Sequence, residues 1–281
     1  MPQSFKSNTN SVSNEDFLIG RFQAMGCPCE ILLDTTDSSL RTQQLASARE
    51  EAERIEQKYS RYRRGNIVDE INSSQGKKVA VDEETAALLD FAAQCYDMSN
   101  GLFDITTGVL RNGFDPSRIG WDKVSWEKPH IQLPRGFEID FGGVCKEYAA
   151  DKILDLSIKR HSIATLVNLG GDIAAAGERL WSVGIEDVTL PGQVARTIHF
   201  RQGGVATSGT TKREGHILNP KTGRPVVNAP ESVTVAAKTC TEAGFWSTLA
   251  ILHGEGAEAF LKEQSLEFWC FRTSTKETVK K

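Results

Sequence analysis

Apolar residues recur at helical spacing through much of the chain. Between residues 40 and 60, five of them form one stripe with charged residues opposite: Leu45, Ala48, Ala52, Ile55 and Tyr59. Such a stripe predicts an amphipathic helix. Further helices are expected over residues 83–98, 147–161, 241–253 and 257–264, and Asn100-Gly101 is typical of a helix end.

Shorter apolar runs bounded by turn residues predict strands. The segment 17–33 is expected to hold one or two strands with a turn at Gly26 and Pro28. The other strand candidates are residues 79–81, 134–141, 165–168, 181–185, 197–200, 204–208, 232–237 and 266–271. No repeat or low-complexity linker divides the chain, so this mixture predicts one α+β domain over residues 17–273.

Composition narrows the class of protein. The 281 residues are 39% hydrophobic and 25% charged, as in soluble globular proteins, and the net charge of −4 argues against a nucleic-acid partner. The sequence contains no run of 18 apolar residues, so we expect no insertion into a membrane. Residues 1–16 are polar and resemble no secretory signal, so we expect a disordered tail and a cytoplasmic location. Residues 274–281 are expected to form a polar C-terminal tail.

The six cysteines are scattered, which favours reduced, buried thiols. The close pair Cys27-Pro-Cys29 is too short for a CxxC redox or zinc motif.

Glycine-bearing blocks are the strongest chemical signal. They are GLFDITTG (residues 101–108), EIDFGGVCKEYAAD (138–151) and GHILNPKTGRP (215–225). Glycine inside a regular element costs about 0.5–1 kcal/mol relative to alanine, so packing does not explain them. Two glycines after Asp140, just before a helix, instead allow backbone N–H groups to approach an anion. The blocks therefore predict a phosphate-bearing ligand.

Seven short motifs, taken in order, resemble those of the ApbE family of FAD:protein FMN transferases. They are Met25-Gly26, YSRYR (59–63), FDIT (103–106), DFGG with KEYAAD (140–151), NLGGDI (168–173), TSG (207–209) and HILNPKTGRP (216–225). The likeness covers roughly residues 19–272. It implies a single domain related to the T-fold, with mixed or antiparallel sheets and flanking helices.

The resemblance also implies a reaction. Family members bind FAD and Mg²⁺ and transfer FMN to a Thr or Ser hydroxyl of a target flavoprotein, with release of AMP. Catalysis of such a phosphoryl transfer depends mainly on positioning and on neutralising charge.

The resemblance places the flavin beside Met25 and Tyr62, whose ring offers a flat apolar face. Leu102 and Phe103 would also contact the cofactor. Asp104 would accept a hydrogen bond from a ribityl or adenosine hydroxyl. On local grounds, Asp104 also suits the cap of the following turn.

The central block would hold the pyrophosphate. Asp140 would lie against FAD at the end of a strand, and the amides of Gly142 and Gly143 would face the phosphates. Lys146 would pair with a phosphate as a point charge. The neighbouring Glu147 is expected to point the other way along the helix.

The third block supplies His216 and Ile217, which would contact FAD. His216 is the best candidate for a polar group near the transferring phosphate, so His216 and Asp140 are the predicted catalytic residues.

One departure from the family pattern concerns the metal. The family holds Mg²⁺ with two backbone carbonyls, here Gly143 and Ser247, with a threonine, here Thr248, and with an Asp four residues before that threonine. Gly244 stands at the Asp position. We therefore expect Mg²⁺ to bind weakly or only with FAD, because Mg²⁺ usually needs one or two carboxylates.

Two groups are candidates to compensate for the missing carboxylate. Asp140 or Glu242 would supply charge, although Glu242 and Thr248 lie on roughly opposite faces of a regular helix. The N-terminal amides of the helix at Thr241 would otherwise neutralise the pyrophosphate. Gly244→Asp would strengthen the site, unless glycine is needed there for a close contact.

Three functions stay open from the sequence. The chain is an FMN transferase with a remodelled metal site, an FAD-binding relative without transferase activity, or an FAD pyrophosphatase in which water replaces the acceptor hydroxyl.

Overall fold

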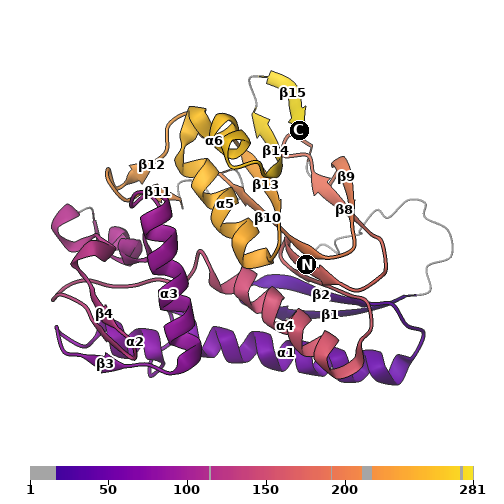
Figure 1. Cartoon of the computed structure of the whole chain (residues 1–281), viewed down its shortest axis with the longest axis horizontal. Coiled ribbons are helices and arrows are strands. Elements are labelled where there is room, and N and C mark those ends of the chain that lie inside the picture. The colour runs from indigo at the N-terminus through magenta and orange to yellow at the C-terminus, as the bar shows by residue number, and fades with distance from the viewer. Residues whose placement is uncertain (1–16, 114, 191, 211–216, 273–274, 281) are drawn as a thin grey trace, which may run out of the picture.

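The computed structural model describes residues 17–113, 115–190, 192–210, 217–272 and 275–280. The predicted tail over residues 1–16 and the candidate His216 lie outside the described residues. The described part forms one α+β domain with helices packed on an antiparallel sheet (Figure 1). The predicted fold class is therefore confirmed.

The main sheet has eight strands in the order β1-β2-β6-β7-β10-β13-β14-β15, and every neighbouring pair is antiparallel. Its strands are β1 (Leu18–Ala24), β2 (Cys27–Leu33), β6 (Thr165–Leu169), β7 (Asp172–Ala176), β10 (Gly203–Gly209), β13 (Ser232–Ala237), β14 (Glu267–Arg272) and β15 (Thr275–Lys280). The last strand falls in the segment expected to be a polar tail.

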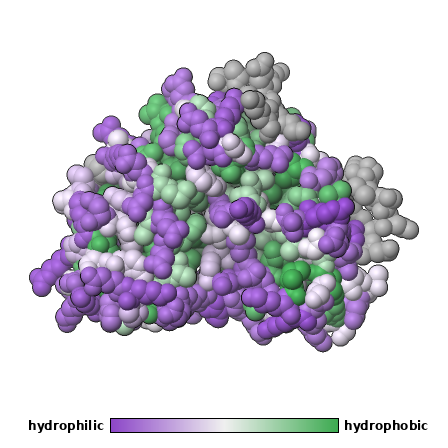
Figure 2. Space-filling model, viewed as in Figure 1, coloured by the Kyte–Doolittle hydropathy of each residue, from purple (hydrophilic) through white to green (hydrophobic). Residues whose placement is uncertain are grey.

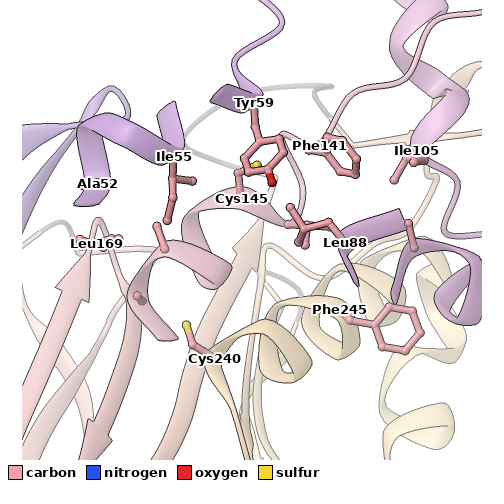
Figure 3. Packing of buried hydrophobic residues seen from close by; sticks show 14 of the residues in the cluster. Ala52, Ile55, Tyr59, Leu88, Ile105, Phe141, Cys145, Leu169, Cys240 and Phe245 are labelled. Carbon is pink, nitrogen blue, oxygen red and sulfur yellow. The ribbon is translucent and has the colours of Figure 1, made fainter. Parts of the chain in front are cut away.

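Three helices cover one face of this sheet: α1 (Ser38–Tyr59), α4 (Cys145–His161) and α5 (Cys240–Leu252). The predicted stripe of α1 is buried at Ala48, Ala52, Ile55 and Tyr59. Helix α4 lies between α1 and α5, and its first turn packs beside Tyr59 and Phe141, whose ring centroids are 5.6 Å apart (Figure 3). Helix α6 (Ala257–Glu263) packs on α5 and β14.

The opposite face is partly covered by a hairpin of β8 (Trp181–Glu186) and β9 (Val194–Phe200). Trp181, Ile185 and Ile198 of this hairpin are buried in one cluster with side chains from β6, β7 and β10. The sheet therefore carries an apolar core on both faces.

A smaller lobe packs beside α5 (Figure 1). It contains α2 (Ile67–Asn72), α3 (Glu83–Met98) and a three-stranded sheet of β3 (Val79–Ala80), β5 (His130–Gln132) and β4 (Ser125–Glu127). Short elements complete the fold: η1 (Ile105–Asn112), η2 (Pro116–Arg118), η3 (Trp121–Lys123), β11 (Leu218–Asn219), β12 (Arg224–Pro225) and η4 (Gly254–Gly256).

The predicted strand over residues 134–141 is wrong. Residues Pro134 to Phe137 form a turn closed by a backbone hydrogen bond. The backbone of Ile139 then bonds in both directions to the Asn72 side chain, at 2.8 and 3.0 Å. The side-chain amide thus replaces a strand ladder, and the apolar side chains are buried without a sheet.

The surface follows the amphipathic pattern of the helices. Hydrophilic residues dominate the margin along which α1 runs (Figure 2). Among the described residues, none of the helices combines the length and the apolar character needed to cross a membrane.

Candidate active site

A cleft of about 1440 Å³ opens at one end of the main sheet and extends along the sheet face toward β8. Its wall is built from the β1–β2 turn, the β6–β7 turn, the end of β10 and the loop before α4. In an antiparallel sheet, alternate connections fall at the same end, so these segments meet although they are far apart in the sequence. All seven motifs contribute lining residues within the described part of the chain.

The β1–β2 turn presents Met25 to the cleft. Met25 and Gly26 both have positive φ, 52° and 71°, as in the two-residue turns that suit a twisted hairpin. The Met25 N–H donates to Oε2 of Glu56 at 3.0 Å, which fixes this unusual backbone against α1.

Tyr62 also lines the cleft and is 74% exposed, and the Arg61 guanidinium carbon lies 5.8 Å from the centre of its ring. Arg61 beside it donates to the Gly108 carbonyl at 3.1 Å and to Oδ2 of Asp140 at 3.0 Å. Arg61 was not among the predicted site residues, although it links two of the motifs.

Asp140 shapes the loop that precedes α4. Its Oδ1 accepts a hydrogen bond from the Gly142 N–H at 2.9 Å. The Gly142 N–H, which was predicted to face the pyrophosphate, is therefore already hydrogen-bonded to Asp140. Gly143 is exposed, and a Cβ added there would meet only the Phe103 ring, at 4.0 Å. Gly143 therefore leaves room for a close ligand.

The FDIT motif and the Leu102 before it have apolar and polar roles. Phe103 is buried and packs edge-on against Phe245, with ring centroids 5.4 Å apart, while Leu102 is half-buried at the cleft. Asp104 caps η1, since its Oδ1 accepts from both the N–H and the hydroxyl of Thr106, at 2.8 and 2.7 Å. Burial raises the pKa of Asp104. The local interpretation of Asp104 as a turn cap is thus confirmed.

Lys146 lies in the cleft wall and forms an ion pair with Asp172 of the NLGGDI motif. Burial opposes its charge, but the carboxylates of Asp172 and Glu147 outweigh burial and raise the pKa of Lys146. The predicted phosphate partner is therefore a cation already held by a carboxylate. Asp172 itself was not predicted.

The position of Glu147 differs most from the prediction. It was expected to point away from Lys146, but it lines the same cleft and is only 7% exposed. Burial, reinforced by Asp172 and opposed by Lys146, raises the pKa of Glu147 to about 7. Its Oε2 has no hydrogen-bond partner among the described residues.

Helix α5 presents two hydroxyls toward β10. Ser208 Oγ lies 2.9 Å from both Ser247 Oγ and Thr248 Oγ1. Thr248 lines the cleft, whereas the Ser247 side chain is fully buried and bonds the Gly244 carbonyl at 3.1 Å. Of the predicted metal ligands on α5, only Thr248 has its side chain at the cleft.

The N-terminus of α5 is not available to a pyrophosphate. The N–H groups of Cys240 and Thr241 donate to the Asp151 carboxylate, each at 2.8 Å. The Glu242 N–H donates to Thr239 Oγ1 at 3.1 Å. The expectation that these amides neutralise the ligand is therefore wrong, because α4 and the N-cap already satisfy them.

Glu242 does not line the cleft, but Ile217 does. Within the described residues no three His, Cys, Asp or Glu side chains gather as a metal site. A metal ion here would need ligands from the backbone, hydroxyls or a bound phosphate.

The model of the ApbE family matches residues 25–270. The chain belongs to the ApbE family. An FAD:protein FMN transferase of Klebsiella pneumoniae is 34% identical over 137 residues, which cover 46% of this chain and 42% of that protein. One of Treponema pallidum is 31% identical over 241 residues, covering 69% of this chain and 67% of the relative. The chain thus spans less than half of one relative and about two thirds of the other.

Solved structures agree with the family assignment. The ApbE protein of Thermotoga maritima superposes with a TM-score of 0.82 at 25% identity, covering 90% of this chain and 94% of that one. The apo flavinyl transferase ApbE of Pseudomonas stutzeri gives a TM-score of 0.81 at 21% identity, covering 94% and 93%. At 21% identity, the likeness to the Pseudomonas stutzeri structure supports the fold alone.

Proposed function

We propose that this chain is an FAD:protein FMN transferase. The observation that carries the proposal is the convergence of all seven ApbE motifs on one cleft. The cleft is larger than the 300–1,000 Å³ typical of small-molecule pockets, which suits a dinucleotide with a protein segment beside it. Family membership and the shared name of the curated relatives support the same activity.

In the proposed reaction, the hydroxyl oxygen of an acceptor Thr or Ser attacks the phosphorus of the FMN half of FAD. A P–O bond to the acceptor forms, and the bond from that phosphorus to the bridging oxygen breaks. AMP leaves with the bridging oxygen, and the hydroxyl proton is released. The partner is therefore a flavoprotein with a Thr or Ser that can enter the cleft.

The residues of the cleft have positioning roles in this proposal. Tyr62 and Met25 would contact the flavin, and Leu102, Phe103 and Ile217 would bound the cofactor. The open backbone at Gly143 and the ammonium of Lys146 would lie along the phosphates, with Asp140 holding the glycine turn. His216, outside the described residues, stays our candidate for a polar group near the transferring phosphate. Mg²⁺, when bound, would neutralise charge on the pyrophosphate oxygens.

The residues fit such a cation. Glu147, whose buried Oε2 has no hydrogen-bond partner in the described part of the chain, and Thr248 both carry hard oxygen donors and line the same cleft. The backbone carbonyl oxygens of Gly143 and Ser247 stay predicted ligands of the cation.

The test is to incubate the purified chain with FAD, MgCl₂ and candidate flavoproteins, and to measure intact masses and AMP. The proposal predicts one FMN phosphoryl added per acceptor, with an equal amount of AMP, and no addition when the modified Thr is replaced by Val. AMP and free FMN formed without any acceptor would indicate a pyrophosphatase. FAD bound but not consumed would indicate a binding protein.

A further inference from the structure

Glu147 is a buried acidic residue, and acidic side chains are rarely buried without a partner. It lies in the first turn of α4, its side chain is buried, and Oε2 has no hydrogen-bond partner among the described residues. Burying an unpaired polar group is unfavourable, so such a group usually has a partner, an ion or a water. Lys146 is already paired with Asp172. Asp172 and Glu147 place two carboxyl groups beside this one ammonium, and a bound cation would balance them.

Gly244 shows where the Glu147 carboxyl group points. A Cβ built on Gly244 would lie 2.6 Å from Cγ, 3.0 Å from Cδ and 2.9 Å from Oε1 of Glu147. The Glu147 side chain therefore fills the space into which a side chain at position 244 would extend. Real Cβ atoms do not approach neighbours this closely, so glycine at 244 and glutamate at 147 are sterically coupled.

Thr248 lies one helical turn after Gly244, and residues four apart share one face of a helix. Glu147 of α4 and Thr248 of α5 both line the cleft, and the Glu147 side chain packs against Gly244, one turn before Thr248. Mg²⁺ is typically bound by one or two carboxylates together with substrate phosphates, and this arrangement offers one carboxylate.

We propose that Glu147 and Thr248 bind a hard divalent cation of the magnesium class, with the carboxylate supplied from α4 because Gly244 cannot supply one from α5. The inference rests on the proposed function only in that the pyrophosphate of FAD completes the coordination shell. It also explains the glycine at position 244, which makes room for the glutamate.

The experiment measures Mn²⁺ binding by electron paramagnetic resonance, with and without FAD. Loss of even an outer partner of a metal site costs about 10–100-fold in affinity, so Glu147→Gln should weaken Mn²⁺ binding at least tenfold. Asp155→Asn is the matched control, since it removes an exposed carboxylate from the same helix and should keep wild-type affinity. A change below about threefold in Glu147→Gln would overturn the proposal.

A second pair of variants tests the steric coupling. Gly244→Asp alone should weaken Mn²⁺ binding, because its side chain collides with Glu147. The double variant Glu147→Ala/Gly244→Asp moves the carboxylate to α5 and should bind Mn²⁺ at least tenfold more tightly than Glu147→Ala. A folded double variant that binds no better than Glu147→Ala would contradict the shared position. Glu242→Gln should bind like wild type, and a loss there would assign the cation to Glu242 instead.

The two proposals fail separately. Glu147-dependent Mn²⁺ binding without FMN transfer to any acceptor would leave the cation site standing and reject the transferase. FMN transfer together with Mn²⁺ binding that is unchanged in Glu147→Gln would support the transferase and reject the cation site. Circular dichroism melting of each variant shows that the folded protein is being compared.

Discussion

Asp140 illustrates how much of the site depends on single polar side chains. Its carboxylate receives Arg61 on one oxygen and the Gly142 N–H on the other. The sequence indicated its place beside the glycines, but not Arg61, because that contact joins segments distant in the chain. Local sequence shows which residues are unusual, whereas their partners depend on the fold.

Asp140→Ala is expected to weaken FAD binding about tenfold, because the Gly142–Gly143 turn loses its side-chain acceptor, a bond worth roughly 1–1.5 kcal/mol. Stability should fall only modestly, since Arg61 keeps Glu138 as a neighbour at 3.8 Å. Flavin fluorescence titration and thermal melting measure the two effects. Asp140→Asn retains an acceptor oxygen and should lose less affinity. Unchanged FAD affinity in Asp140→Ala would remove Asp140 from the site.

Tyr62→Ala should weaken FAD binding about tenfold, since stacking on an aromatic ring is worth roughly 1–3 kcal/mol. The side chain is mostly exposed, so the free energy of unfolding should change by less than about 0.5 kcal/mol. Tyr62→Phe keeps the ring and serves as the control in the same titration. Equal affinities for all three proteins would show that the flavin does not contact this ring.

Gly244→Ala tests the packing of α5 against Glu147. Replacing glycine by alanine inside a helix normally stabilises it by about 1 kcal/mol. Here the added Cβ meets the Glu147 side chain, and overpacking costs about 1–3 kcal/mol, so no gain is expected. In a Glu147→Ala background the gain should return. Urea unfolding of the four proteins gives the coupling energy, and an equal gain in both backgrounds would contradict the close contact.

At the scale of elements, the apolar pattern predicted the helices and strands whose formation depends on local periodicity. The stripe of α1 was expected and is present. One or two strands with a turn at Gly26 and Pro28 were also expected; two strands and a turn at Gly26 are present, but Pro28 lies inside β2. Residues 134–141 have a strand-like pattern, but Asn72 satisfies their backbone, and this long-range partner leaves no trace in local sequence. The role of Glu147 was missed for the same reason, since it depends on how α4 packs against α5.

Glu84 of α3 connects three helices. Its carboxylate accepts from Arg54 at 2.6 Å and Lys58 at 2.7 Å on α1, and from the Tyr148 hydroxyl at 3.0 Å on α4. The Arg54 hydrogen bond, which outweighs burial, and the Lys58 contacts lower the pKa of Glu84 to about 2, from 4.5. A carboxylate with a lowered folded-state pKa adds stability above its unfolded pKa, and this stability is lost as pH falls.

Glu84→Gln should therefore destabilise the protein at pH 7, by on the order of 1 kcal/mol after allowance for solvent screening. The loss should shrink between pH 4.5 and pH 2, where wild-type Glu84 becomes protonated. Urea unfolding of both proteins at pH 7, 4.5 and 3 measures this. A difference that stays constant over these values would mean that the Glu84 charge is not responsible.

At the scale of the whole molecule, the order of motifs along the chain predicted the family and the ligand class, and membership of the ApbE family is confirmed. Their meeting at one end of a sheet depends on antiparallel topology, which motif order alone does not define. The β8–β9 hairpin also lines the cleft, although none of its residues was predicted as part of the site. The cytoplasmic location and a target flavoprotein with an acceptor Thr or Ser stay predictions.

A crystal structure of the chain with FAD and Mn²⁺ would test the central claim most directly, because Mn²⁺ can be located by its anomalous scattering. We expect the flavin beside Met25 and Tyr62, the pyrophosphate along Gly143 and Lys146, and the Mn²⁺ peak between Glu147 and Thr248. FAD bound outside this cleft, or a Mn²⁺ peak away from Glu147 with FAD in place, would contradict the account.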